Sequence, residues 1–304
     1  MQTSLMSKAE QIFGDLSLLD STKVMHSHAV VLKDSKLNQI VFGAPGAPCC
    51  SLDLYFFNLL RIRAQCMITS GKIVRNDPYA FNTDFHLKKN GLDEDDFFNY
   101  LDEQHQQMST KPLAIITRTL KTNFFEDAIV LKDLRFLKLV ITEERIAQEY
   151  LKSQEQEWKI SQDLVKRRLR EDYNIQLTGI QDFNFTKAVE FISQDQELQP
   201  ILSELGAATF RTQYINNHST NPVDLLYLGI YNGQADDSQI GLELSTLDQI
   251  ISQYDLQKQS KLYPQEDGRG KWLLTIWTKR QTELHSQDTI QEIKDKLTQQ
   301  FECN

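Results

Sequence analysis

Short apolar segments alternate with amphipathic ones along most of the chain, and the spacing of their apolar residues predicts strands and helices in turn. Residues 23–32 favour a strand, because valine and leucine suit a pleated, half-buried surface. A loop rich in glycine and proline follows at 43–48, and residues 52–63 then place five apolar side chains on one helical stripe. The apolar run at 66–69 fits a buried strand, and Gly71 allows a tight exit from it.

The same alternation continues downstream. Further strands are predicted at 113–117, 137–142, 175–177, 201–203, 225–231 and 271–279. Helices are predicted over 143–170, 187–193 and 247–256. Because strands alternate with helices, we expect an α/β fold with a mostly parallel central sheet flanked by helices, and with antiparallel strands at the C-terminal end.

The domain organisation follows from the absence of an internal repeat or a low-complexity linker. We expect one domain over 21–280, preceded by a helical extension at 1–20 and followed by a helical tail at 281–304. Two polar segments, 88–108 and 234–262, are interpreted as insertions in that domain.

Composition narrows the class of protein. The 304 residues are 40% hydrophobic and 25% charged, which excludes wholesale disorder. The net charge of -9 argues against a sequence-independent grip on nucleic acid and against docking on anionic lipid. Charged residues interrupt every apolar run well short of a membrane span, and the first twenty residues have no features of a signal or transit peptide. We therefore expect a soluble, intracellular protein, in the cytoplasm or an organelle.

The cysteines agree with a reducing compartment. The chain has four, without a Cys-x-x-Cys pair or a Cys/His ligand spacing. Adjacent Cys49 and Cys50 are stereochemically able to form a strained vicinal disulfide, but we interpret them as two buried or half-buried thiols.

Several local patterns point to chemistry only weakly. His26 and His28 share one face of a strand, but no third metal ligand lies nearby, so we interpret them as a satisfied strand face. The basic run at 166–170 stands beside acidic residues and is interpreted as a solvated helix face. The acidic run at 93–96 lacks the glycine and the terminal glutamate of an EF-hand, and 268–271 lacks phosphate-loop spacing and predicts a hairpin turn. No metal site is predicted.

Two strand ends are better candidates for a binding site. Residues 68–72 run from a buried strand into a glycine turn, and Lys72 stands beside it. Residues 202–208 also run from a strand into a glycine turn. Ligands collect at such strand ends in parallel α/β sheets, so the pair would suit a dinucleotide lying across neighbouring strands. Tight packing at a strand–helix corner is the alternative explanation of either glycine.

The order of segments resembles a known family. Residues 60–78, LRIRAQCMITSGKIVRNDP, are similar to the central motif of the reductase half of the bacterial bifunctional riboflavin-biosynthesis deaminase-reductase, which has a dihydrofolate-reductase-like fold. The motif aligns without a gap over 64–78, and its matching positions are Gly71, Asp77, Pro78 and the apolar run 66–68. No deaminase half is present in the sequence.

Other segments follow in the family's order, so that the resemblance covers about residues 23–280. These segments are Asp34-Ser35-Lys36, 111–116, 140–144, 203–207 and 223–226. The resemblance implies a reductase that binds NADPH and delivers hydride to the ribosyl carbon of a phosphorylated pyrimidine intermediate. It places eight residues against the cofactor: Thr69, Ser70, Gly71, Lys72, Glu204, Leu205, Gly206 and Ala207. It places Asp34 and Asp77 toward the substrate.

The departures from the family pattern cluster at that site. Glycines of the family fall at Ser35, Thr69 and Leu205, its threonine falls at Lys72 and a serine falls at Leu32. A side chain at Leu205, where backbone must approach a pyrophosphate, can block binding.

Three hypotheses therefore stay open. The first is an active NADPH-dependent reductase, acting on a small nucleotide-like substrate. The second is a catalytically degenerate relative that serves as a structural or interaction subunit, as a homodimer or within a larger assembly. The third is pyrimidine or pterin binding without turnover.

Overall fold

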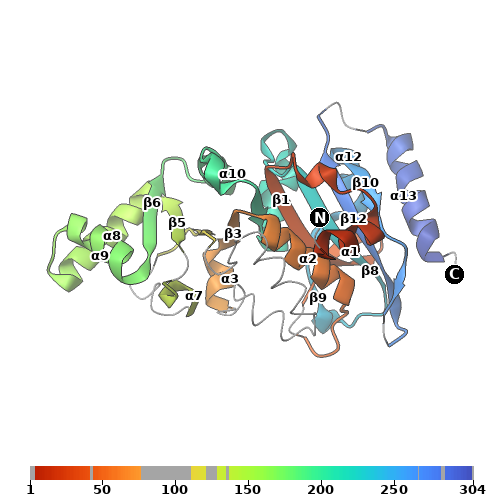
Figure 1. Ribbon diagram of the computed structural model, residues 1–304, viewed down its shortest axis with the longest axis horizontal. Coiled ribbons are helices and arrows are strands. Elements are labelled where there is room, and N and C mark those ends of the chain that lie inside the picture. The colour runs from red at the N-terminus through yellow and green to blue at the C-terminus, as the bar shows by residue number, and fades with distance from the viewer. Residues whose placement is uncertain are drawn as a thin grey trace. The chain divides into compact units, whose positions relative to one another are not determined.

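The computed structural model describes residues 4–41, 44–76, 111–120, 129–134, 137–265, 267–281 and 285–302. Two compact units make up the chain. Unit 1 comprises Met1–Leu60 and Gly206–Asn304, and unit 2 comprises Arg61–Leu205. The elements of both are labelled in Figure 1. The boundaries predicted at residues 20 and 280 remain a prediction.

Unit 2 is built on parallel strands in the order β7-β3-β4-β5-β6. They are β3 (Cys66–Ser70), β4 (Leu113–Ile116), β5 (Lys138–Glu143), β6 (Ile175–Ile180) and β7 (Ile201–Ser203). The chain adds β4, β5 and β6 successively on one side of β3 and then returns to place β7 on the other side. The strand order therefore reverses between β3 and β7, which is the switch point where open parallel sheets bind ligands.

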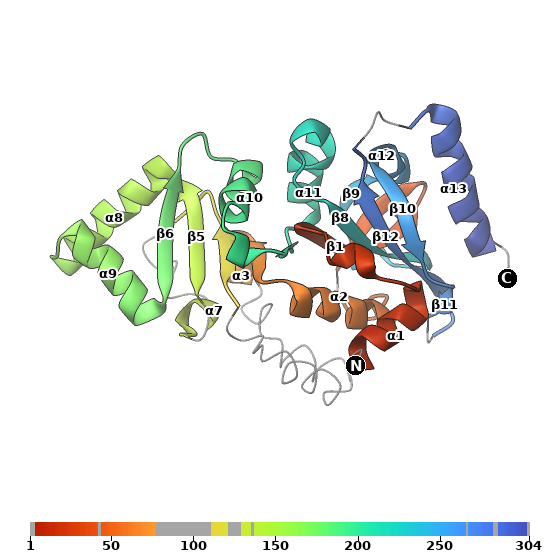
Figure 2. The same cartoon turned by 45° about the horizontal axis from the view of Figure 1, so that its top comes forward.

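Helices cover this sheet and complete the core of unit 2. They are α3 (Gly71–Asn76), α7 (Ile129–Lys132), α8 (Glu144–Trp158), α9 (Gln162–Tyr173) and α10 (Phe185–Ser193), with a 3-10 turn η3 (Gln196–Leu198). Met67, Ile115 and Val140 from successive strands pack in one buried cluster with Leu151 of α8 and Leu169 of α9. Figure 2 shows α8 and α9 alongside β5 and β6.

The long helix predicted over 143–170 is wrong. The chain forms α8 and α9 instead, because Lys159 adopts a left-handed backbone conformation (φ 54°) that ends α8. Ser161 is then extended and begins α9. Neither glycine nor proline marks the break, so apolar spacing alone runs through it.

Unit 1 has a mixed sheet. Its strands are β1 (Val24–Lys33), β2 (Lys36–Ile40), β8 (Leu225–Gly233), β9 (Ile240–Thr246), β10 (Tyr254–Gln259), β11 (Tyr263–Pro264) and β12 (Gly270–Lys279). β1 and β8 are parallel neighbours, whereas β12 is antiparallel to β8, β10 and β11. β2 turns back on β1, and β9 pairs with β2.

The helices of unit 1 lie on both faces of this sheet. They are α1 (Ser4–Phe13), α2 (Ser51–Arg63, ending inside unit 2), α11 (Ala207–Gln213), α12 (Leu247–Gln253) and α13 (Gln287–Glu302), with 3-10 turns η1 (Ser17–Leu19), η4 (Ile215–Thr220) and η5 (Asp237–Gln239). Tyr227 of β8 reaches Asp53 of α2, and His26 of β1 stacks on Phe210 of α11. Tyr227 pairs in register with Ser27, the neighbour of His26, so α2 and α11 cover opposite faces.

The predicted fold class is confirmed: parallel strands flanked by helices, with antiparallel strands toward the C-terminus. The helix predicted over 247–256 ends at Gln253, because Tyr254 is extended and begins β10. The segment 88–108 lies outside the described residues. Within the described part of the chain, every helix is too short or too polar to cross a membrane.

Candidate functional site

The carboxyl ends of β3 and β7 meet at the switch point of unit 2. Ile68 and Ser203 are partners in the parallel register. The Glu204 N–H donates to the Ile68 carbonyl at 2.8 Å, which extends the pairing one residue past β7. The two sequence segments chosen as strand-end candidates are therefore adjacent, as far as residue 205.

Gly71 stands at the corner between β3 and α3 because no larger residue fits. A Cβ added at Gly71 would lie 2.7 Å from the Oγ1 of Thr117, which follows β4. Thr117 is itself held in place, because its hydroxyl donates to the Thr119 carbonyl at 2.9 Å. The alternative explanation from the sequence, tight packing at the corner, accounts for this glycine.

Thr69 and Ser70, the last residues of β3, differ in accessibility. Thr69 is fully buried, and its Oγ1 has no hydrogen-bond partner among the described residues. Ser70 is half-buried, and its Oγ accepts the Ile73 N–H at 3.3 Å. Ser70 therefore orders the first turn of α3, and it is the more accessible hydroxyl of the two.

Glu204 forms an ion pair with Arg61, a residue that the sequence did not indicate as part of the site. Its Oε1 and Oε2 accept hydrogen bonds from Nε and Nη2 of Arg61, respectively, each at 2.6 Å. The two side chains are only 4% and 10% exposed. An arginine in the last turn of a helix rich in apolar residues is a signal for such a pair, but its partner stands 143 positions away.

The three residues after Glu204 lie in different settings. Leu205 is fully buried, so its side chain does not project into solvent. Gly206 belongs to unit 1, where its carbonyl accepts the Thr209 and Phe210 N–H groups at the start of α11. Its φ of −64° is open to any residue, and an added Cβ would meet nothing within 4 Å. The Ala207 N–H faces the Gln39 Oε1 at 3.5 Å. The joint crevice predicted between Gly71 and Gly206 remains a prediction.

Three cationic residues stand close along the chain to the corner at Gly71 or to the end of the neighbouring strand β4. Lys72 and Arg75 of α3 are exposed, and Arg118 is exposed just after β4. The Arg75 Nη1 lies 3.3 Å from the position that a Cβ at Gly71 would take. The Thr117 hydroxyl lies close to the same position. This arrangement suits an anionic group, because guanidinium and ammonium groups donate to phosphate oxygens. Among the three, only Lys72 was selected from the sequence.

Asp34, the substrate candidate, lies in unit 1 at the tip of the β1–β2 hairpin. Asp34 and Ser35 both have left-handed backbones, with φ of 50° and 62°, as a two-residue turn between twisted strands requires. Asp34 lines a hollow of about 460 Å³ at the carboxyl ends of β1 and β8, together with Lys33, Asn232 and Asp236. Asp77 lies outside the described residues.

Unit 1 contains a buried carboxyl, that of Asp53, which the sequence did not indicate as a candidate. Asp53 is 4% exposed, and its Oδ1 accepts the Tyr227 hydroxyl at 2.8 Å. Burial raises the pKa of Asp53 to about 7, against the lowering effect of the Tyr227 hydrogen bond. Gly229 leaves room for this carboxyl, since an added Cβ would lie 2.0 Å from Oδ1. An acid near the helix start looks like ordinary capping in the sequence, so only the fold shows its burial.

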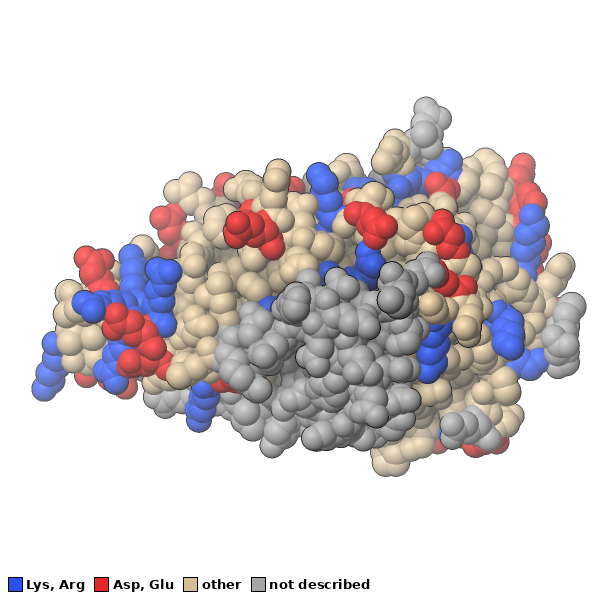
Figure 3. Space-filling model, in the orientation of Figure 1, with Lys and Arg blue, Asp and Glu red and all other residues tan. Residues whose placement is uncertain are grey.

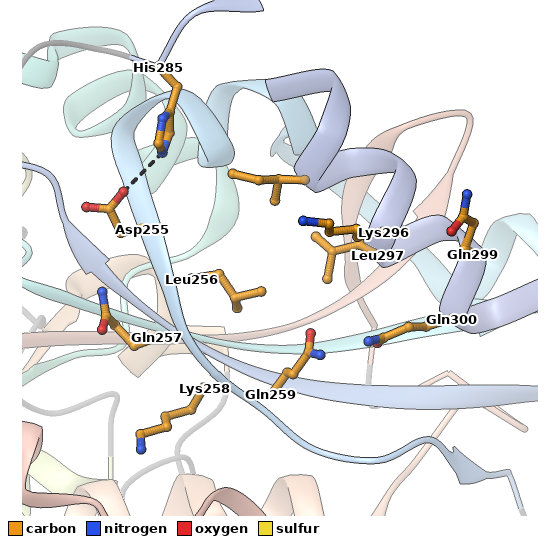
Figure 4. Close-up of a pocket in the computed structure, with 11 residues that line it drawn as sticks. Asp255, Leu256, Gln257, Lys258, Gln259, His285, Lys296, Leu297, Gln299 and Gln300 are labelled. Atoms are coloured by element: carbon orange, nitrogen blue, oxygen red, sulfur yellow. Dashed lines mark hydrogen bonds and ion pairs between the residues drawn. The ribbon is translucent and has the colours of Figure 1, made fainter. Parts of the chain in front are cut away.

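A larger hollow of about 750 Å³ lies between β10 and α13 (Figure 4). Leu256 and Leu297 face each other across it, and glutamine amides line its rim. The Asp255 carboxylate at one end is already engaged by His285 at 3.0 Å and Arg280 at 3.2 Å. The lining therefore offers an apolar floor rather than a set of reactive groups.

The remaining candidates have structural explanations. His26 is buried and stacked on Phe210, with ring centroids 4.2 Å apart. Arg167 and Arg168 pair with acids one turn on, which confirms a solvated face, and Figure 3 shows acidic and basic atoms side by side at the α8–α9 end. Cys49, Cys50 and Cys66 form no disulfide, and Cys49 is exposed rather than half-buried. No three His, Cys, Asp or Glu side chains gather as a metal site within the described ranges.

Comparison with known proteins gives structural likeness without close sequence relatives. No family model and no curated protein matches the sequence. The chain is similar to a pyrimidine reductase-like protein from Corynebacterium diphtheriae, with a TM-score of 0.57 and 14% identity, over 90% of this chain and 98% of that one. This likeness confirms, at the level of the fold, the resemblance to pyrimidine reductases seen in the sequence.

Two longer proteins match less well. RibD from Acinetobacter baumannii has a TM-score of 0.46 and 14% identity over 90% of this chain. A diaminohydroxyphosphoribosylaminopyrimidine deaminase/5-amino-6-(5-phosphoribosylamino)uracil reductase from Thermotoga maritima has a TM-score of 0.48 and 9% identity over 87% of this chain. The chain spans 63% and 58% of their lengths, respectively.

Proposed function

We propose that the chain is a divergent reductase of the riboflavin-biosynthesis family that uses NADPH to reduce the ribosyl carbon of a phosphoribosylamino-pyrimidine. The observation that carries the proposal is the meeting of β3 and β7 at the switch point of unit 2, with Ser70, Gly71 and Lys72 at the end of one strand and Glu204 just after the other. The fold shared with a pyrimidine reductase-like protein supports it.

The donor set around Gly71 fits a phosphorylated dinucleotide. NADPH carries three phosphates, and Lys72, Arg75 and Arg118 would hold the negative charge that distinguishes it from NADH. When bound, NADPH supplies the hydride of the reduction, and the protein supplies orientation.

The substrate would be bound through hydrogen-bond acceptors. Asp34, Asp236 and Asn232 line the hollow at the ends of β1 and β8, where carboxylates suit the hydroxyl and amino groups of a ribosylamino-pyrimidine. Asp77 would also lie toward the substrate, as the resemblance implies. Reduction of the ribosyl carbon requires a proton as well as the hydride, and solvent supplies it.

One observation favours the alternative, a catalytically degenerate member that serves as a homodimer or as a subunit of a larger assembly. Leu205 is fully buried, and Glu204 is held by Arg61, so the second turn offers neither a bare backbone nor a free carboxylate. The family's glycine at that position brings backbone to the pyrophosphate, and a leucine removes that approach.

Titration of the protein with NADPH separates the two. We expect saturable binding below millimolar concentration, weakened at least tenfold in Lys72→Glu and in Arg118→Glu, with a smaller loss for NADH. Lys166→Glu, on the solvated face of α9, is the matched charge reversal and leaves binding unchanged. A titration that stays flat to millimolar NADPH excludes the reductase and leaves the subunit function.

A further inference from the structure

We propose that Arg61 is a positioning residue, which holds the turn at Glu204 and Leu205 against the end of β3. The inference rests on the proposed cofactor site, because that turn forms one of its walls. It assigns Arg61 no contact with cofactor or substrate.

The geometry of the pair carries this assignment. Arg61 stands in the last turn of α2, and its Nε and Nη2 each donate to a different oxygen of Glu204 at 2.6 Å. Both carboxylate oxygens are therefore engaged by one planar guanidinium. This fork–fork arrangement fixes the orientation of the carboxylate as well as its distance, which a single hydrogen bond does not.

The backbone of the same residue is fixed independently. The Glu204 N–H donates to the Ile68 carbonyl at 2.8 Å, so Glu204 is tied to β3 through its amide and to α2 through its side chain. Leu205, the next residue, is fully buried. Two attachments on one residue determine where the chain leaves β7, and Arg61 supplies one of them.

The burial of the pair argues that it serves conformation more than stability. Its side chains are 4% and 10% exposed, and moving two charges out of water costs free energy that their attraction offsets only when the geometry is good. Apolar residues of similar volume commonly stabilise such a position equally well. Unlike a pair of apolar side chains, the ion pair is satisfied in only one relative orientation of its two side chains. Such a fixed orientation suits a turn that has to contact a cofactor.

The test combines amide hydrogen exchange with cofactor titration in Arg61→Lys. Lysine keeps the charge but loses the fork, so we expect the Glu204 amide to exchange at least tenfold faster relative to the Ile115 amide of β4. We expect the dissociation constant for NADPH to rise about tenfold.

Lys138→Met is the matched control. Lys138 is a buried cation at the amino end of β5, and its Nζ donates to the Asp133 carbonyl. Its loss should lower the melting temperature of unit 2 while leaving the ratio of Glu204 to Ile115 exchange and the NADPH affinity unchanged. Equal changes in Arg61→Lys and Lys138→Met would show a general loss of stability and overturn the inference.

The two arms separate this inference from the proposed function. If the wild-type chain does not bind NADPH, the reductase proposal fails, but faster Glu204 exchange in Arg61→Lys still supports the positioning role. Unchanged Glu204 exchange overturns that role, whatever the affinity for NADPH. Should Arg61→Lys fail to fold, Glu204→Gln is read in the same way, because it keeps the volume and removes the charge.

Discussion

In unit 2 the largely buried side chain of Glu204 lies against the guanidinium of Arg61, whereas in unit 1 the buried Asp53 accepts a hydrogen bond from the neutral hydroxyl of Tyr227. Unit 2 also buries Lys111, whose ammonium donates to the carbonyls of Arg61, Ile62 and Ala64 in and just after the last turn of α2. Unit 2 therefore keeps buried charges beside opposite charges or carbonyls, and unit 1 keeps a buried acid beside a hydroxyl.

The difference shows two ways in which a fold accommodates a buried ionisable group. An opposite charge offsets the cost of burying a charge, whereas a buried group with only neutral partners shifts its pKa toward the neutral form. Burial raises the pKa of Asp53 to about 7 and lowers the pKa of Lys111 to about 8. The two units should consequently respond to pH in opposite directions, which the first two predictions test.

The largest expected effect is a loss of unit 1 stability as the pH rises. The pKa of Asp53 is about 7 in the fold and 3.8 as its ordinary value, so its contribution is full below pH 3.8 and is lost as the pH rises to about 7. The loss is at most about 4 kcal/mol, at about 1.4 kcal/mol per pKa unit. Urea unfolding followed by the buried Trp272 and Trp277, in a Trp158→Phe background, measures it.

Asp53→Asn is the control for this prediction. Asparagine keeps an acceptor for the Tyr227 hydroxyl and cannot ionise, so the dependence on pH between 4 and 7 should flatten. An unchanged slope in Asp53→Asn would assign the effect to another group.

The second effect has the opposite sign and belongs to unit 2. With a pKa of about 8 in the fold and 10.5 as its ordinary value, Lys111 binds fewer protons folded than unfolded over that range. The free energy of unfolding should therefore rise between pH 8 and 10.5, by at most about 3 kcal/mol. Trp158 fluorescence, taken as the difference between the wild type and Trp158→Phe, reports on this unit. Lys111→Met should reduce the rise, and the remainder belongs to Lys138, whose pKa burial also lowers to about 8.

A third, smaller effect tests whether the Asp53 carboxyl needs the space at Gly229. In Gly229→Ala the new Cβ would lie 2.0 Å from Oδ1, so the carboxyl has to move, and we expect a loss of about 2 kcal/mol in urea unfolding. Gly206→Ala is the matched control, with open space around its Cβ, and should change stability by less than about 0.5 kcal/mol. In an Asp53→Ala background the Gly229→Ala loss should shrink, and an undiminished loss would place the clash elsewhere.

The smallest effect concerns the turn that carries Asp34. Ser35 has a φ of 62°, a conformation that a glycine adopts without strain. Ser35→Gly should raise the free energy of unfolding by about 0.5 kcal/mol, since relief of strain exceeds the added flexibility of the unfolded chain. A decrease in the thermal midpoint would contradict this account of the turn.

The spacing of apolar residues along the chain predicted most of the helices and strands, but few of the contacts at the candidate site. The helix over 52–63 is confirmed because its apolar residues recur with the helical period, and the strand over 66–69 because a short continuous apolar run is typical of a strand buried on both faces. The break at Lys159 was invisible, because a left-handed lysine leaves no trace in the spacing of apolar residues. Glycine at 71 was recognised as important, but its reason, the hydroxyl of Thr117, comes from the next strand.

By itself, then, the sequence determined the alternation of strands and helices, the class of fold and the two strand ends where a ligand is expected. The tertiary structure alone decided that β7 lies beside β3, that Arg61 meets Glu204 across 143 positions and that Asp53 meets Tyr227 across 174. The physical reason is that periodicity reflects the local surroundings of each residue. Which strands become neighbours, and in what register, depends on how the whole chain shares its buried surface.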